Sequence, residues 1–187
     1  MKSFIAYIDG GSRGNPGVAG YGVFLLDENR NPLAEISEPI GIQTNNHAEY
    51  LALIGALRYT HSQQGEALQV YADSELLVRQ INGQYKVRNP KLKELYDQAQ
   101  VLIRGLKRFT LQHIPREENR EADRLANQAM DQASGSVTLA SPSSQTVRAV
   151  FKSGCFCPLQ PLNLPEGEEF QLTIGRLKAS HSAEKSR

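Results

Sequence analysis

Several residue types and patterns are scarce or absent in this chain of 187 residues. It has no tryptophan and only two cysteines, Cys155 and Cys157, which one residue separates. So close a pair is a weak sign of a metal site, and idle thiols in a reducing compartment are the favoured interpretation. No apolar run approaches the roughly 20 residues of a membrane span, and the N-terminus, MKSFIAYIDG, lacks the pattern of a secretory signal. These absences predict a cytoplasmic protein without a membrane partner.

A strong net charge is also missing. The chain has 21 basic and 20 acidic side chains, a formal charge of +1, which does not by itself indicate a nucleic-acid-binding protein. Residues 1–133 hold 15 of the basic and 16 of the acidic side chains, a balance of −1. If four of those acids are concentrated in one site, the remaining surface carries +3. That surface would supply a modest basic field around an acidic site.

Hydrophobic periodicity organises residues 1–133 into one mixed unit. Strands are predicted at 4–9, 20–27, 33–40, 68–73 and 108–114, and helices at 44–63, 74–83, 90–106 and 120–133. The glycine-rich segment between the first two strands is interpreted as a long hairpin turn, and Asn45 or Asn46 as the N-cap of the first helix. This order predicts an α/β (α+β) fold: a five-stranded mixed sheet flanked by helices, with the first and fourth strands as parallel neighbours.

The composition changes after residue 133. Residues 134–146 are small and polar and are predicted to form a linker. Residues 147–174 contain two alternating apolar runs around a proline-rich middle, which favours a small β unit, and residues 175–187 are predicted to be disordered. A unit of about 28 residues buries little surface alone, so we expect it to dock on the first domain or pair with a copy of itself.

Four acidic residues lie where a carboxylate is unfavourable because of burial or is not needed for the local structure. Asp9 ends the apolar strand FIAYI, where burial penalises a carboxylate unless a cation or several donors receive it. Glu49 lies on the first turn of a largely apolar helix, and Asp123 lies beside the inner stripe of the last helix. Asp73 ends a strand and begins a helix, but Ser74 can cap that helix equally well, which leaves Asp73 for another role.

Each acid also has a simpler interpretation. Asp9 precedes glycine and can form a hairpin turn. Glu49 can be the reciprocal partner of Asn46 in a capping box, and Asp73 can be an N-cap. Asp123 can serve only to complement the helix dipole. Taken singly, these interpretations are fair, but they do not use the architecture that ties the four positions together.

In the predicted sheet, Asp9 and Asp73 stand side by side at the carboxyl ends of the central strands, where such sheets usually bind ligands. Clustered carboxylates without a counter-charge repel by several kcal/mol or take up protons. Hard divalent cations relieve that repulsion, and ligation by oxygen alone favours Mg²⁺ or Mn²⁺ over zinc. A pair of such ions about 4 Å apart activates a water and stabilises the leaving oxygen in phosphodiester cleavage.

Four motifs follow one another in residues 1–133: YIDGGSRGNPG, TNNHAEY, YADSELLVRQI and HIPREENREADRLAN. In order and spacing they closely resemble the motifs of type 1 ribonuclease H, the ribonuclease HI family. The resemblance implies the ribonuclease H-like fold and endonucleolytic hydrolysis of the RNA strand of RNA/DNA hybrids, which leaves 5′-phosphate and 3′-hydroxyl ends. It also implies a two-metal-ion mechanism with two Mg²⁺ or Mn²⁺ ions in the active site.

The same resemblance assigns roles to residues. The implied metal ligands and catalytic carboxylates are Asp9, Glu49, Asp73 and Asp123. His113 matches a mobile histidine that assists proton transfer or product release. The implied contacts to 2′-hydroxyls and phosphates are Gly10, Gly11, Asn15, Thr44, Asn45 and, beside the active-site loop, Asn119. Sequence specificity is not expected, because sugar and phosphate contacts carry none.

Two departures from the family pattern are visible. The segment 73–95 lacks the long, tryptophan-containing basic handle with which some bacterial members clamp substrate. A reduced substitute is supplied by Lys86, Arg88, Lys91 and Lys93. Glu75 replaces an amide seen in several members, and its negative charge argues against a direct copy of that minor-groove contact.

The C-terminal extension resembles a short β-rich antitoxin-like domain through the pattern VFK-G----PLQPLNLPEGEEFQLTI. Self-association, binding of a toxin-like partner, extra substrate contact and simple stabilisation stay open as its role. Two alternatives to the ribonuclease function also stay open: another nuclease of the same superfold, and a non-catalytic nucleic-acid-binding or antitoxin-like regulator. The presence of all four acids favours the enzyme.

Overall fold

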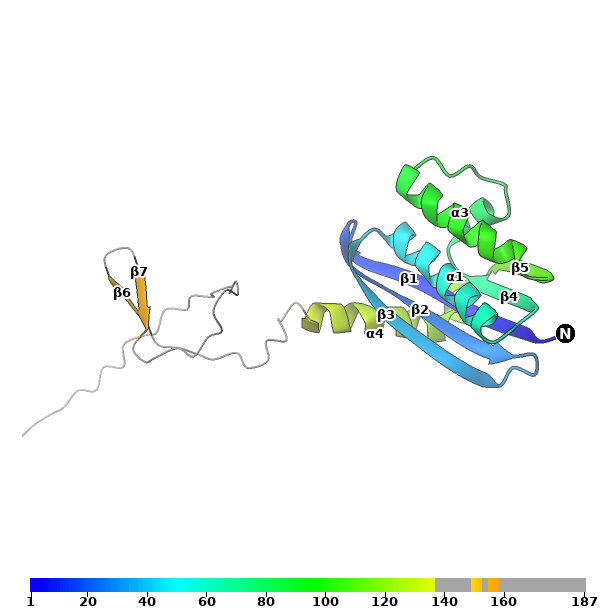
Figure 1. The fold of residues 1–187 in the computed structure, drawn as a ribbon, viewed down its shortest axis with the longest axis horizontal. Helices are drawn as coiled ribbons and strands as arrows, with labels where there is room; N and C mark the ends of the chain where they lie inside the picture. Colours follow the sequence, from blue (N-terminus) through cyan, green and yellow to red (C-terminus); the bar gives the residue numbers. More distant parts are fainter. Residues whose placement is uncertain (137–148, 153–154, 159–187) are drawn as a thin grey trace, which may run out of the picture. The chain divides into compact units, whose positions relative to one another are not determined.

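The computed structural model describes residues 1–136, 149–152 and 155–158 (Figure 1). Five strands form one mixed sheet in the order β3-β2-β1-β4-β5. Their bounds are β1 Ser3–Gly14, β2 Gly17–Asp27, β3 Pro32–Gln43, β4 Ala67–Ala72 and β5 Arg108–His113. β1 pairs antiparallel with β2 and parallel with β4, which confirms the predicted central pair of parallel strands.

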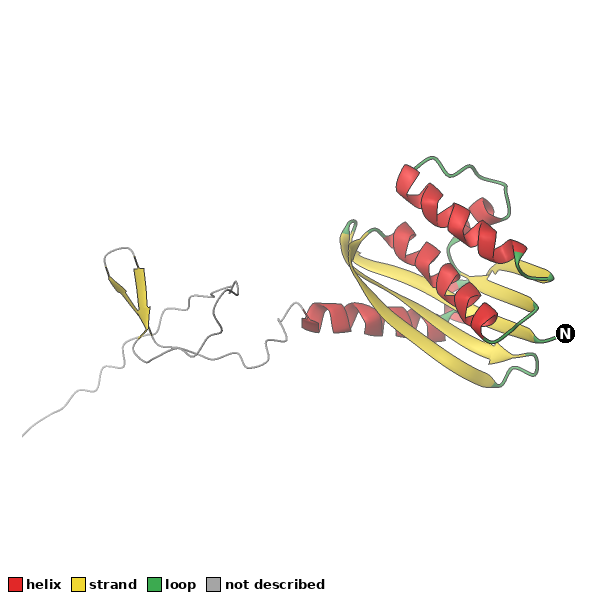
Figure 2. Ribbon diagram, in the orientation of Figure 1, coloured by secondary structure: helices red, strands yellow, loops and turns green. Residues whose placement is uncertain are grey.

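Helices cover both faces of this sheet. The helices are α1 Asn45–Ser62, α2 Glu75–Ile81, α3 Pro90–Arg104 and α4 Arg120–Ser136, and a short 3-10 turn, η1, spans Arg116–Glu118. α1 and α3 lie on one face and α4 lies on the other (Figure 2). This arrangement confirms the predicted α+β class. Among the described residues, no helix combines the length and the apolarity needed to cross a membrane.

The hairpin of β1 and β2 is longer than the sequence predicts. The two strands stay paired as far as Gly14 and Gly17, so the expected long turn shrinks to a tight turn at Asn15 and Pro16. The glycines in this region serve close packing instead. A Cβ on Gly22 would lie only 2.4 Å from the main-chain oxygen of Ala122 in α4, so glycine is what lets this helix lie directly on the strand.

The apolar face of α1 packs on the sheet as predicted. Its inward side chains are buried, with exposed fractions of 1% or less: Tyr50, Leu53, Ile54 and Leu57. The N-cap is Thr44, not Asn45 or Asn46, because the Thr44 hydroxyl accepts a hydrogen bond from the His47 N–H at 3.3 Å. Asn45 is therefore the first residue of α1, and its side chain is available for other contacts.

The chain divides into two compact units, Met1–Ser141 and Pro142–Arg187. In the second unit, β6 (Ala149–Lys152) and β7 (Cys155–Pro158) form an antiparallel two-stranded sheet. This pair lies within the segment 147–174, for which a small β unit is predicted. α4 continues three residues into the predicted linker, since no proline stops it there. The rest of the linker and the predicted disordered tail lie outside the described residues.

Candidate active site

Four segments far apart in the sequence each bring one carboxylate to the carboxyl ends of β1 and β4. Asp9 lies inside β1, opposite Gly22, so its interpretation as a turn former is wrong. Asp73 follows β4 directly, Glu49 lies in the first turns of α1, and Asp123 lies in the first turn of α4. The four acids share one open pocket, which is lined by Asp9, Gly10, Gly11, Asn45, Glu49, Asp73, Ser74, Arg116, Asp123, Asn127 and Met130.

The approach of α1 to β1 depends on Gly10. A Cβ on this buried residue would lie 2.2 Å from the main-chain nitrogen of Glu49, closer than side chains come in practice. The missing side chain therefore faces α1 and not a ligand, and it allows Glu49 to reach the pocket of Asp9. A Cβ on Gly11 would meet the Cε of Met130 at 2.7 Å. That the backbone at these two glycines also contacts substrate stays a prediction.

Two side chains hold Glu49 in the pocket. The Ser74 hydroxyl donates to Glu49 Oε2 at 2.5 Å, and Asn45 Nδ2 donates to Oε1 at 2.8 Å. Glu49 is thus not the reciprocal partner of a capping box. Ser74 is the N-cap of α2, where its hydroxyl accepts from the Leu77 N–H at 3.3 Å. This confirms that Asp73 is not needed as a cap.

Asp73 is held by Asn119, whose Nδ2 donates to Asp73 Oδ1 at 3.0 Å. Only 1% of Asn119 is exposed, and the same Nδ2 donates to the main-chain oxygen of Ile8 at 2.9 Å. In this arrangement the Asn119 side chain is bonded to Asp73 and to β1. The substrate contact that the family resemblance implies for Asn119 stays a prediction.

Asp123 is held from two sides. Arg116 donates to Asp123 Oδ1 at 2.6 Å, and Asn127, one turn further along α4, donates to Oδ2 at 3.0 Å. The sequence analysis missed both residues. Asn127 could have been found, because it lies four residues after Asp123 on one helix face. Arg116 could not, since only the fold of the loop before α4 brings it over the pocket.

Burial and repulsion by neighbouring acids disfavour the charged forms of Asp9 and Glu49. Burial, and then the charges of Asp73, Asp123 and Glu49, raise the pKa of Asp9 to about 7, although the Gly10 N–H donates to its carboxylate. The pKa of Glu49 is also raised to about 7, first by burial and then by Asp73, against the opposing bonds from Ser74 and Asn45. The pocket thus attracts cations, because a nearby positive charge would stabilise the ionised carboxylates.

Arg116 supplies such a charge. Its pKa is raised, chiefly by the hydrogen bond to Asp123, with smaller contributions from the charges of Asp9 and Asp73. The Arg116 side chain is 73% exposed, whereas that of Asp123 is 28% exposed. The Arg116 side chain therefore lines the pocket from its solvent side and can leave it without disturbing the core.

The donor set suits a hard divalent cation, because it consists of carboxylate oxygens alone. Within the described residues, however, no three acidic, histidine or cysteine side chains are placed to hold a metal ion. In this arrangement Arg116 engages Asp123, while Ser74 and Asn45 engage Glu49. Asp123 already lines the pocket with the other three acids, and release of Arg116 would free its Oδ1 to accept a cation there.

The remaining predicted site residues surround the pocket. His113 ends β5, beside Ala72 in the parallel register, and is exposed, but it does not line the pocket. Asn15, in the tight turn, accepts from the main-chain N–H of Asn45 at 3.3 Å through its Oδ1. The Thr44 hydroxyl is used in the N-cap of α1. The hairpin turn and the start of α1 are thus joined at one rim of the pocket.

Glu75, which departs from the family pattern, forms an ion pair with Arg79 one turn further along α2. The guanidinium of Arg79 in turn lies 5.0 Å from the ring centroid of the exposed Tyr85. The negative charge of Glu75 is therefore neutralised locally. This arrangement agrees with the expectation that Glu75 does not copy an amide contact.

A mixed sheet of this strand order, with four carboxylates gathered at the carboxyl ends of its central parallel strands, defines a ribonuclease H-like domain. A family model described as reverse transcriptase-like matches residues 7–129. The chain belongs to this reverse transcriptase-like family of ribonuclease H domains. A second family model, described as AF2212-like, matches residues 144–186, most of which lie outside the described residues.

Named relatives match about two thirds of this chain. The bifunctional protein Rv2228c of Mycobacterium tuberculosis is 46% identical over 129 residues, which cover 68% of this chain and 35% of that protein. Ribonuclease HI of Halobacterium salinarum is 39% identical over 128 residues, which cover 68% of this chain and 64% of that protein. The chain therefore spans only about a third of the length of the mycobacterial relative.

A solved structure agrees with both. The crystal structure of LC11-RNase H1 in complex with an RNA/DNA hybrid matches 70% of this chain and 98% of its own, with 46% identity and a TM-score of 0.65. The similarity extends over nearly all of that protein and over 70% of this chain. It supports the predicted ribonuclease H-like fold with a structure that contains an RNA/DNA hybrid.

Proposed function

We propose that this chain is a ribonuclease H that hydrolyses the RNA strand of RNA/DNA hybrids and leaves 5′-phosphate and 3′-hydroxyl ends. The observation that carries the proposal is the convergence of Asp9, Glu49, Asp73 and Asp123 in one pocket of a ribonuclease H-like fold. The halobacterial relative is named ribonuclease HI, and the LC11 enzyme was crystallised with a hybrid, which supports this substrate.

We further propose that the four carboxylates hold two divalent cations, Mg²⁺ or Mn²⁺. When bound, such cations lower the pKa of water and neutralise the charge that develops on the departing oxygen. The other residues of the pocket orient the carboxylates and the bound strand. Ser74 and Asn45 keep Glu49 directed into the pocket. Arg116, released from Asp123 as cations enter, is placed to pair with a phosphate of the bound strand.

His113 is proposed to move protons at the same edge of the sheet. It is the last residue of β5, beside β4, and its register partner is Ala72, the residue before Asp73. Its exposure leaves the imidazole accessible to solvent. It would accept the proton of the attacking water or protonate the departing 3′-oxygen.

Discrimination of RNA from DNA requires a group that recognises the ribose 2′-hydroxyl, which both donates and accepts hydrogen bonds. Asn15 and Asn45 stand together at the rim of the pocket, where their amides offer both functions. Asn45 Nδ2 is engaged with Glu49, so its carbonyl oxygen is the group that would accept from a 2′-hydroxyl. This recognition depends on the sugar and would be independent of the base sequence.

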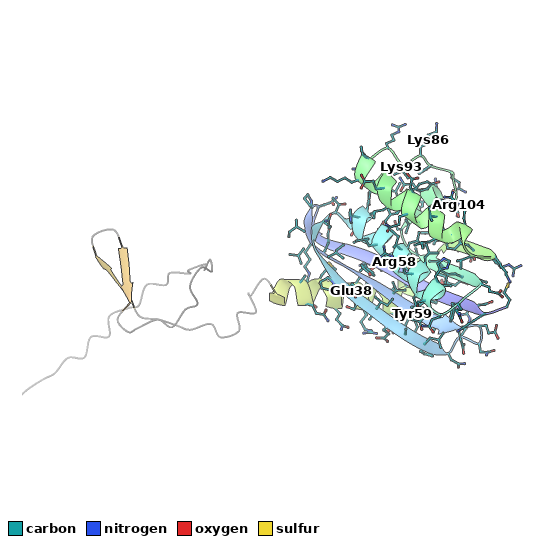
Figure 3. All side chains as sticks on the ribbon, in the orientation of Figure 1. Glu38, Arg58, Tyr59, Lys86, Lys93 and Arg104 are labelled. Atoms are coloured by element: carbon teal, nitrogen blue, oxygen red, sulfur yellow. The ribbon has the colours of Figure 1, made fainter. Side chains whose placement is uncertain are left out.

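Basic side chains flank this rim. Lys91, at the start of α3, lies close enough to His47 of α1 to lower the pKa of that imidazole, although burial is the larger cause. Lys86 lies in the loop before α3 and Lys93 in the first turns of α3, on the face of the sheet that α1 and α3 cover (Figure 3). These charges would attract the phosphates of a hybrid toward the acidic pocket.

We also propose that residues 1–133 are the catalytic domain and that the extension, 147–174, is a separate module joined by the linker 134–146. The division of the chain near Ser141 and the AF2212-like match to residues 144–186 support two modules. Self-association or a toxin-like partner stays a proposal for the second.

A panel of substrates tests the function. Labelled RNA/DNA hybrid, double-stranded RNA and double-stranded DNA of one sequence are incubated with the full chain in Mg²⁺, Mn²⁺ or EDTA. We expect cleavage of the RNA strand of the hybrid alone, in either metal and not in EDTA. Cleavage of double-stranded DNA would instead indicate another nuclease of this superfold. Binding of hybrid without hydrolysis in either metal would indicate a non-catalytic regulator.

A further inference from the structure

Asn119 lies between η1 and α4 and is one of the few polar residues buried in the described part of the chain. Its neighbours in sequence, Glu118 and Arg120, are charged and exposed, whereas only 1% of Asn119 is exposed. Burial of an amide is unfavourable unless its polar atoms are hydrogen-bonded. The contacts that Asn119 makes must therefore account for its position.

Those contacts join three of the four elements that carry the acidic pocket. Nδ2 donates to the main-chain oxygen of Ile8 in β1 at 2.9 Å, one residue before Asp9. The same atom donates to Asp73 Oδ1 at 3.0 Å. The main-chain oxygen of Asn119 accepts from the Asp123 N–H at 3.0 Å at the start of α4. One buried residue is thus bonded next to, or directly to, three carboxylate-bearing positions.

Chemistry fixes the orientation of the amide. Both partners of Nδ2 are acceptors, a main-chain carbonyl and a carboxylate, so a flipped amide would bring three oxygens together. In the fixed orientation, Oδ1 is buried and has no hydrogen-bond partner among the described residues. An unsatisfied buried acceptor costs about 1–3 kcal/mol. Stability alone therefore does not explain the choice of an amide, whereas the two bonds from its nitrogen do.

We propose that Asn119 is a positioning residue of the carboxylate site. Its Nδ2 fixes the Asp73 carboxylate against the end of β1 and offsets part of the repulsion from Asp9, so that both are in place before cations arrive. Residues behind metal ligands act in this way, and their loss typically weakens metal affinity or activity about 10–100-fold. This inference rests on the proposed function, because it assumes that the four acids bind cations.

The test measures cation binding without substrate. Asn119→Leu keeps the size of the side chain and removes the donor, while Asn119→Ser keeps a shorter hydroxyl that can donate one bond. The melting temperature is followed against Mn²⁺ concentration. We expect the Mn²⁺ concentration at half-maximal stabilisation to rise about tenfold or more for the leucine variant. The serine variant should fall between it and the unaltered chain, and it supplies the measurement if the leucine variant does not fold.

Gln80→Met is the matched control. Gln80 is also a buried amide, but its Oε1 accepts from the Tyr50 hydroxyl at 2.8 Å and touches none of the four acids. Its loss should lower the melting temperature and leave the Mn²⁺ midpoint unchanged. An unchanged midpoint in both Asn119 variants, with hybrid cleavage by the unaltered chain, would overturn the inference and leave the proposed function intact. Absent cleavage by the unaltered chain would instead count against the function.

Discussion

The central sheet has two regions of opposite character along the same strands. Under α1, Ile8 of β1 and Leu25 of β2 belong to one core cluster with Leu53, and each of these side chains is 1% exposed or less. One residue beyond Ile8, the strand carries Asp9, whose pKa is raised to about 7 by burial and by neighbouring acids. Apolar packing stabilises the first region, whereas the second destabilises the chain when no cation is present.

This contrast shows how a small domain separates its stability from its chemistry. Natural proteins break the rules of stable packing mainly at functional sites, and the packing elsewhere compensates. Changes in the two regions should therefore have opposite effects. A change at the acidic pocket should lower activity and raise stability, and a change under α1 should lower stability and leave the chemistry of each folded molecule intact.

Asp9→Asn should have the largest effect. The variant loses a ligand at the centre of the pocket, so we expect cleavage of hybrid in Mg²⁺ to fall at least about 100-fold. Because it also removes a buried charge surrounded by like charges, its melting temperature in EDTA should rise by about 2–5 °C at pH 8. Hydrolysis of labelled hybrid and thermal unfolding measure the two quantities.

The control for Asp9→Asn is Asp97→Asn on α3. Asp97 is exposed and pairs with Lys93, so its loss should change neither cleavage nor the melting temperature appreciably. If Asp9→Asn proved less stable than the unaltered chain in EDTA, the acidic pocket would not be a destabilising region, and the contrast between the two regions would fail.

Much of the fold could be predicted because apolar periodicity is a local property of the chain. The buried face of α1 repeats at helical spacing, and Pro90 and Gly105 mark the ends of α3 as expected. The prediction of a long turn before β2 was wrong, because glycine is found both in turns and at close contacts between elements. Sequence alone does not distinguish these two uses. Gly22 shows the second use, since it faces α4 at the distance of a backbone contact.

The acids of the candidate site were predictable from the residues, and the helical spacing of Asn127 was within reach of the same reasoning. Asp9 lies in β1 and Asp73 follows β4, and the topology makes these strands neighbours, so the meeting of the two acids could be argued from the sequence. Two other partners of the acids depend on the turn before α4. Arg116 reaches Asp123 through η1, and Asn119 is buried by the same turn, so neither role has a periodicity or a spacing that sequence could indicate.

Leu53→Ala tests the apolar region under α1. The side chain is fully buried between α1 and the sheet, so its truncation should lower the free energy of unfolding by about 2–5 kcal/mol. Denaturant titration measures this loss. The rate of hybrid cleavage per folded molecule should stay within about twofold at 25 °C. Val101→Ala, at an exposed position of α3, is a control expected to change neither quantity.

The dependence of stability on pH should come largely from the acidic pocket. The folded pKa values of Asp9 and Glu49, about 7, lie above the ordinary values of 3.8 and 4.5. Between these limits the folded chain binds more protons than the unfolded chain, so its stability falls as the pH rises from about 4 to 7. Thermal unfolding in EDTA should show this fall, and Asp9→Asn should reduce it. An identical pH profile for the two proteins would contradict this origin.

Arg116→Gln should have a smaller effect, because the guanidinium is exposed and an exposed ion pair contributes at most about 1 kcal/mol. Without Arg116, Asp123 keeps only the bond from Asn127 and its Oδ1 is open to cations, so the Mn²⁺ midpoint in thermal unfolding should fall about two- to fivefold. The KM for hybrid should rise, since a contact to phosphate is lost. Arg124→Gln, which removes ion pairs on the outer face of α4, is the control. A midpoint that rises instead would show that Arg116 does not compete with cations.

Removal of everything after Ser136 should have the smallest effect on either region. Both the apolar packing and the acidic pocket are built from residues 4 to 130, and the cut after Ser136 preserves all of α4, whereas a cut after Ala133 would remove its last turn. We expect kcat and the melting temperature of the shortened chain to match those of the full chain. A KM that rises in low salt and converges in high salt would assign the second unit a charge-dependent contact with substrate. A large loss of kcat would show instead that the catalytic domain does not end with α4.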